Sequence, residues 1–81
     1  MAQARAAPAR GFRVHARHTD RQSARYVEEV SFEAAAVAYV ETFSPPVTDE
    51  PDISVIVHDV ASGHEQCFRI DLETGDAAPC G

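Results

Sequence analysis

The sequence predicts a small α+β domain, in which one helix packs on an antiparallel sheet and the elements follow the order ββαββ over residues 11–73. Three patterns predict this fold. Apolar and polar residues alternate near the N-terminus, an amphipathic segment of helical period follows, and two alternating segments then flank a glycine. A chain of 81 residues is long enough for one domain only, stabilised by a few kcal/mol.

The N-terminal region divides into a tail and a strand. Residues 1–10 lack aromatic and branched aliphatic side chains, which is typical of a disordered tail. Residues 12–17 (FRVHAR) then alternate apolar and polar side chains, which predicts a strand with one buried face. Arg13, His15 and Arg17 share the outward face of that strand.

A polar turn at residues 19–23 and a second strand at residues 25–30 (RYVEEV) complete a predicted hairpin. A helix is the alternative for residues 12–30, because arginines recur there at every fourth position: Arg13, Arg17, Arg21 and Arg25. Residues four apart lie on the same face of a strand as well as on the same face of a helix. This spacing therefore does not distinguish the two structures. The β-branched and aromatic residues favour strands.

The predicted helix begins after Ser31, a favourable N-cap, and has Glu33 in its first turn, where the helix dipole stabilises a carboxylate. Its apolar stripe consists of Phe32, Ala36, Tyr39, Val40 and Phe43. The Ser-Pro-Pro sequence at residues 44–46 ends it, because a residue before proline avoids the α conformation.

The last third predicts a β-hairpin between residues 53–57 and 68–72, whose alternate residues are apolar. Placing the apolar faces together gives the pairs Val57–Phe68, Val55–Ile70 and Ile53–Leu72. This register closes on a turn at residues 62–63, in which Gly63 supplies a positive φ. Residues 74–81 are predicted to be a C-terminal tail.

Charge is strongly divided along the chain. Residues 1–25 hold six arginines and one carboxylate, a net charge of +5, whereas residues 26–81 hold one arginine and twelve carboxylates, a net charge of −11. Opposite fields on one small protein favour contact with an anion, a partner or a second copy. We expect Arg13, Arg17 and Arg25 to neutralise part of the acidic remainder by pairing with carboxylates, namely Glu28, Glu29, Glu33 or Asp71.

Absent residue types exclude several kinds of chemistry. The chain has no lysine, which excludes a P-loop lysine and a Schiff base, and its four glycines are too scattered for a phosphate loop. We therefore expect no enzymatic activity and no cofactor. Arginine in place of every lysine, together with 14 alanines, indicates the coding bias of a GC-rich bacterium.

The two cysteines, Cys67 and Cys80, are 13 residues apart and form no CxxC motif. The prediction is a pair of reduced thiols in a cytoplasmic protein, with a Cys67–Cys80 disulfide as the alternative. No apolar run approaches the roughly 20 residues that span a bilayer, so no membrane contact is expected. The Ala- and Arg-rich start also admits a transit peptide as an alternative to folded structure.

Two groups of residues are candidate sites. Arginines and a histidine on the sheet are predicted to bind an anion or a partner: Arg13, His15, Arg17 and Arg69. One helix covers only part of a four-stranded sheet, and the apolar surface left over predicts a homodimer interface: Ile56, His58, Val60 and Cys67. The predicted register brings only His58 and Cys67 opposite each other, too few ligands for a metal, so no metal site is predicted.

Together these observations predict a non-enzymatic interaction or regulatory accessory module that forms a homodimer and binds an unidentified protein partner. The alternative is a protein that binds an anion or a nucleic acid through its N-terminal arginines. Nucleic acid is the less favoured ligand, because the chain is acidic overall, with a net charge of −6, and no aromatic residues interleave the arginines for base stacking. The residues Asp49, Glu50 and Asp52 are predicted to be a solvated acidic loop.

Overall fold

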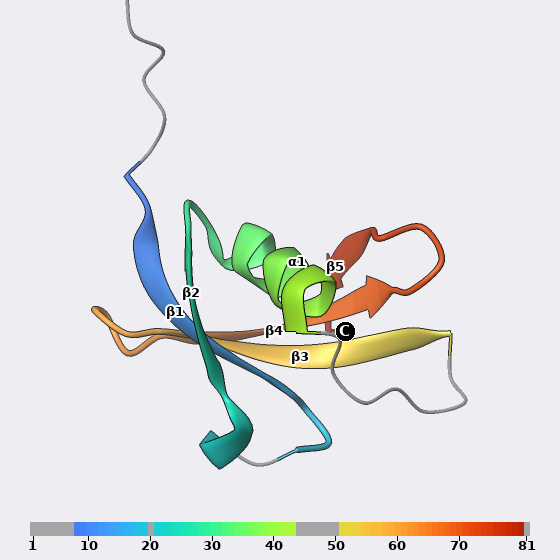
Figure 1. Cartoon of the computed structure of the whole chain (residues 1–81), viewed down its shortest axis with the longest axis horizontal. Coiled ribbons are helices and arrows are strands. Elements are labelled where there is room, and N and C mark those ends of the chain that lie inside the picture. The colour runs from blue at the N-terminus through green and yellow to red at the C-terminus, as the bar shows by residue number, and fades with distance from the viewer. Residues whose placement is uncertain (1–7, 20, 44–50, 81) are drawn as a thin grey trace, which may run out of the picture.

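The computed structural model describes residues 8–19, 21–43 and 51–80. One helix packs on a five-stranded antiparallel sheet in the order β2-β1-β3-β4-β5 (Figure 1), which confirms the predicted fold class. The elements are β1 (Arg10–Ala16), the 3-10 turn η1 (Arg21–Ser23), β2 (Arg25–Glu29), α1 (Phe32–Phe43), β3 (Asp52–Asp59), β4 (Glu65–Asp71) and β5 (Ala77–Pro79).

The N-terminal hairpin forms strands, as the β-branched and aromatic content favours, and not the alternative helix. β1 pairs with β2 so that Phe12 lies opposite Val27. Phe12 and Val14 are fully buried under α1, whereas Arg13 between them is exposed. The period-two alternation therefore places one side of β1 in the core and the other side outside it.

The helix α1 begins as predicted. The Ser31 hydroxyl oxygen accepts a hydrogen bond from the Ala34 N–H at 3.1 Å, which is the N-cap arrangement. Ala36 and Tyr39 of the predicted stripe are buried, and Phe43 at the last position is 39% exposed. The predicted terminator at residues 44–46 and the acidic residues at 49–50 lie outside the described residues.

The C-terminal hairpin has a different register from the predicted one. Val55 lies opposite Phe68, and Ile53 lies opposite Ile70, a shift of two residues. The shift arises because the turn holds four residues, 60–63, closed by a hydrogen bond from the Asp59 N–H to the His64 carbonyl oxygen at 2.8 Å. A shift of two conserves the faces, since two residues is the strand period. The positive φ predicted for Gly63 is present at 80°.

The folded part of the chain extends beyond residue 73, which corrects the predicted tail at 74–81. Residues 77–79 form β5, which pairs with β4 through Ile70 opposite Ala77 and Phe68 opposite Pro79. Ala77 packs against the core. The composition Ala-Ala-Pro has little strand propensity, so this strand depends on its neighbours in the fold.

The core lies between α1 and one face of the sheet, which we call the covered face. It consists of Phe12, Val14, Ala16, Val27, Ala35, Ala36, Tyr39, Ile53, Val55, Val57, Phe68 and Ile70. Helix α1 packs on every one of the five strands. The described helices leave the opposite side of the sheet uncovered, and we call this side the open face.

Candidate functional site on the open face of the sheet

The open face follows from the strand registers, because residues directly opposite one another share a face. Its five rows are Glu28, Gly11 and Val60; Tyr26, Arg13, His58 and Glu65; His15, Ile56, Cys67 and Cys80; Arg17, Ser54, Arg69 and Ala78; and Asp52 and Asp71. Arg17 and Val60 lie just beyond the strands, but their backbone N–H groups continue the ladder to Ser54 and Gly11 at 2.8 and 3.1 Å.

Both predicted groups of site residues lie on this one face. The arginines and histidine predicted to bind an anion occupy its β1 and β4 positions, and the predicted interface residues occupy β3, β4 and the turn between them. The alternation of side chains along each strand was enough to predict their face, because paired strands direct opposite residues to the same side of the sheet. The two predicted sites therefore form a single surface.

His15 departs from its predicted exposed position. It is only 9% exposed, and its Nδ1–H donates a hydrogen bond to the Ala16 carbonyl oxygen at 2.9 Å. It stands opposite Ile56 in the pairing of β1 with β3. A buried ring whose Nδ1 is already bonded leaves little of His15 for an external anion.

His58 lies opposite Glu65, not opposite Cys67 as predicted. The two-residue shift of the hairpin register is the cause. The His58 Nδ1 lies 3.2 Å from a Glu65 carboxylate oxygen. Ile56 takes the place opposite Cys67, so the predicted pair of His58 and Cys67 is not formed.

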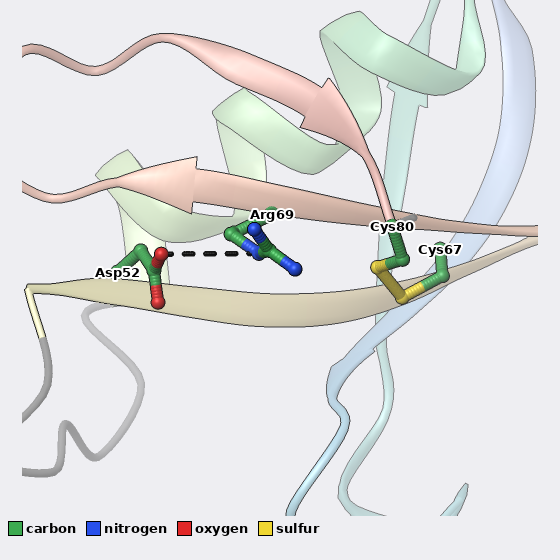
Figure 2. Close-up of a disulfide and its surroundings, with 4 residues drawn as sticks. All are labelled: Asp52, Cys67, Arg69 and Cys80. Carbon is green, nitrogen blue, oxygen red and sulfur yellow. Dashed lines mark ion pairs between the residues drawn. A yellow bond between two sulfur atoms is a disulfide. The ribbon is translucent and has the colours of Figure 1, made fainter.

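Cys67 and Cys80 form a disulfide, which overturns the prediction of reduced thiols. Their Cα atoms are 5.3 Å apart, within the usual range for disulfides. Figure 2 shows the bond joining the end of β5 to β4. The 13-residue separation closes because the β4–β5 hairpin folds back on itself, and the Cys80 N–H donates to the Cys67 carbonyl oxygen at 3.0 Å.

Tyr26 belongs to the open face and was missed as a site residue. Its side chain is 51% exposed and lies over Gly11, where a Cβ atom would stand 2.8 Å from the Tyr26 Cε1 atom. Partial burial and the neighbouring Glu28 carboxylate raise the pKa of Tyr26. Its place directly before Val27 in RYVEEV was the available sign, since neighbouring residues of a strand point to opposite faces and Val27 points into the core.

The ion pairs differ from the predicted ones. Arg21 binds both oxygens of the Glu65 carboxylate at 2.6 and 3.2 Å, and this hydrogen bonding lowers the pKa of Glu65 against the opposing effect of burial. Arg69 lies 3.8 Å from Asp52 (Figure 2). Arg10 lies 3.2 Å from Asp59.

Arg13, Arg17 and Arg25 do not pair with the carboxylates expected for them among the described residues. Arg25 lies over the ring of Phe43, 5.7 Å from its centroid. Arg13 and Arg17 are exposed and form no ion pair within the described part of the chain. These two guanidinium groups on the open face therefore remain accessible to an external carboxylate or phosphate.

Carboxylates also gather beside the helix. Two shallow grooves of about 500 and 290 Å³ flank α1, and no predicted site residue lines either of them. The acidic residues that line them are Glu29, Glu33, Glu41, Asp71 and Glu73. Within the described ranges no three His, Cys, Asp or Glu side chains gather as a metal site requires, and no described helix is long and apolar enough to cross a bilayer.

Asp59 closes the hairpin turn and is 2% exposed. Burial alone would raise its pKa, but hydrogen bonds from the Ala61 N–H and from Ser62, together with the nearby Arg10 guanidinium, outweigh burial and lower the pKa. A folded-state pKa below the unfolded value means that the ionised carboxylate stabilises the fold.

The stabilisation by Asp59 should be present above about pH 4, the ordinary pKa of aspartate, and be lost as the pH falls through the lower folded-state value. We expect Asp59→Asn to lower the melting temperature at pH 7 and to reduce its fall between about pH 4 and pH 2. Thermal denaturation of the wild type and of Asp59→Asn across this pH range tests the prediction. Glu73→Gln, which alters an exposed carboxylate, is the control, and equal acid dependence in wild type and Asp59→Asn would contradict the prediction.

Fold and site together define a small α+β domain with one helix-covered face and one open sheet face that carries accessible arginines. A family of unknown function, DUF5961, matches residues 10–81, and the chain belongs to this family. The matched residues include all five strands, the helix and both cysteines. Comparisons with curated proteins and with solved structures found no match.

Proposed function

We propose that this protein is a non-enzymatic interaction module that works as a homodimer and binds a carboxylate-bearing surface of a partner protein through its open face. The observation that carries this proposal is the pair Arg13 and Arg17. Both are exposed on the same face of β1 and its continuation, and neither is neutralised within the described part of the chain.

The chemistry of the face suits a protein partner. Each guanidinium group presents a planar fork of donors that matches the two oxygens of a carboxylate. Tyr26 and Val60, 51% and 48% exposed, add apolar contact beside Arg13. Tyrosine and arginine are enriched in protein interfaces and among the residues that contribute most to affinity.

The net charge of −6 does not exclude this interaction, because two carboxylates of the open face, Glu65 and Asp52, are paired with Arg21 and Arg69. Further carboxylates line the grooves beside the helix. Surface fields are screened over about 8–10 Å at physiological ionic strength. A nucleic acid presents a long line of phosphates that would also meet those carboxylates. An acidic patch on a protein is small enough to meet the open face alone, and we favour it for that reason.

The disulfide supports an oxidising environment as the place where the protein works. Disulfides persist in oxidising environments and are rare in reducing cytosol. With Cys67 and Cys80 joined, our proposal places the working protein in an oxidising environment, in contrast to the cytoplasmic location predicted from the sequence.

The test compares the wild type with Arg13→Ala/Arg17→Ala, using poly-L-glutamate as the probe in a fluorescence titration at low salt. We expect the affinity to fall at least about tenfold, with a melting temperature close to that of the wild type, because exposed charges contribute little to stability. The control is Arg21→Ala/Arg69→Ala, whose arginines are already paired within the chain.

Two results would overturn the proposal. One is equal binding of poly-L-glutamate by the wild type and the Arg13→Ala/Arg17→Ala variant. The other is preferential binding of a single-stranded oligonucleotide by the wild type, with the steep salt dependence typical of phosphate contacts. The second result would instead support the alternative of nucleic-acid binding.

A further inference from the structure

β2 is an outer strand of the sheet, and its second edge has no partner strand among the described elements. The orientation of its backbone groups follows from β1. The Arg17 N–H and the Gly11 carbonyl oxygen bond to the chain of β3, so odd-numbered residues of β1 direct their polar groups toward β3. Phe12 and the other even-numbered residues therefore bond to β2, because these directions alternate in antiparallel sheets.

The outward backbone groups of β2 are those of Tyr26 and Glu28. Val27 is opposite Phe12 and directs its N–H and C=O toward β1. Tyr26 and Glu28, on either side of it, direct theirs away from the sheet. The strand thus offers a short ladder of unused donors and acceptors, which is a template for pairing with another strand.

The sequence of β2 is complementary to itself when two copies run antiparallel about Val27. Tyr26 of one copy then lies opposite the partner's Glu28, and both residues have the outward backbone groups that such a pair requires. Arg25 lies opposite the partner's Glu29, so opposite charges meet twice. Directly opposed pairs of this kind stabilise antiparallel strands, whereas like charges destabilise them.

Neighbouring registers lack this complementarity. A shift by two residues in one direction places Glu28 opposite the partner's Glu28, and a shift in the other direction places Tyr26 opposite the partner's Tyr26. Both shifts separate Arg25 from the partner's Glu29. Like charges oppose the first shift, and the second shift lacks the two opposite-charge pairs, so the register centred on Val27 is the most favourable of the three.

We propose that a second copy of this chain binds the edge of β2, through antiparallel β2–β2 pairing centred on Val27. The inference rests on the homodimer of the proposed function and identifies its surface. A two-fold axis through this contact lies perpendicular to the sheet, so both helices lie on one side and the two open faces join on the other. The arginines proposed to bind a partner are thereby presented twice on one continuous surface.

The first test exchanges charges between two variants, Arg25→Glu and Glu29→Arg. Each variant alone places like charges opposite each other at both symmetric positions, so we expect its dimerisation to weaken about tenfold or more. An equimolar mixture restores both opposite-charge pairs and should dimerise as the wild type does. Sedimentation equilibrium over a range of concentrations gives the dissociation constants.

The second test is Glu28→Pro, which removes an outward N–H that pairing with β1 does not use. We expect this variant to be a folded monomer, and Glu28→Ala, which keeps the N–H, to retain most of the dimer. The proposal is overturned if the mixture fails to recover dimerisation, if Glu28→Pro dimerises like the wild type, or if the wild type is a monomer of 8.8 kDa at millimolar concentration. Binding of poly-L-glutamate by a monomer would leave the open-face proposal standing.

Discussion

Replacing both cysteines, Cys67→Ser with Cys80→Ser, should lower the free energy of unfolding by about 2–4 kcal/mol. The disulfide closes a loop with a sequence separation of 13 and so restricts the unfolded chain. It also holds β5, which has only three residues and pairs with β4 at three positions. Such a loss is a large fraction of the stability of a domain this small.

Urea denaturation at 25 °C, followed by circular dichroism, measures this effect. A reductant should lower the midpoint of the wild type and leave the doubly substituted variant unchanged. Alkylation of the unreduced wild type, followed by mass spectrometry, should detect no free thiol at Cys67 or Cys80. Equal midpoints for wild type with and without reductant, once reduction is verified by alkylation, would contradict the prediction.

Replacing Phe12 with alanine should cost about 3–5 kcal/mol, which would leave much of the protein unfolded at 25 °C. Phe12 is fully buried under α1. Its ring contacts Phe32 edge to face, with the centroids 5.1 Å apart, and the Arg10 guanidinium lies 5.2 Å from its centroid. The substitution removes the ring from the centre of the contact between helix and sheet and leaves a cavity.

The same denaturation experiment provides the measurement. Phe12→Leu, which fills part of the cavity, should lose roughly 1–2 kcal/mol and remain folded. Tyr26→Ala, which removes an exposed aromatic ring from the open face, is the matched control and should lose much less. A Phe12→Ala variant as stable as Tyr26→Ala would show that Phe12 is not central to the core.

The residues of the open face were largely predictable, because side chains along a strand alternate between the two faces of the sheet. The hairpin prediction paired Val57 with Phe68, whereas the structure pairs Val55 with Phe68. The error of two residues exchanged the neighbours of His58 and Cys67 but left both on the same face. The position of Arg13 outside the core was predictable for the same reason.

Contacts between side chains were less predictable than faces. The expected partners of Arg13 and Arg17 were chosen by charge, but the structure joins Arg21 to Glu65 across 44 positions of sequence. Exposed ion pairs contribute only about 0–1 kcal/mol to stability. They form where the fold brings opposite charges together and do not direct the fold. Arginine spacing therefore carried no information about pairing.

The amino-acid sequence by itself determined the period of each element, the N-cap at Ser31 and the division of each strand into a buried and an outward side. These properties are local, since they depend on backbone geometry and on the burial of apolar side chains. Tertiary structure alone decided the four-residue turn, the strand β5 and the Cys67–Cys80 disulfide. Each of these requires segments to be brought together in space, and weak local preferences such as that of Ala-Ala-Pro become strands only when a neighbouring edge supplies the hydrogen bonds.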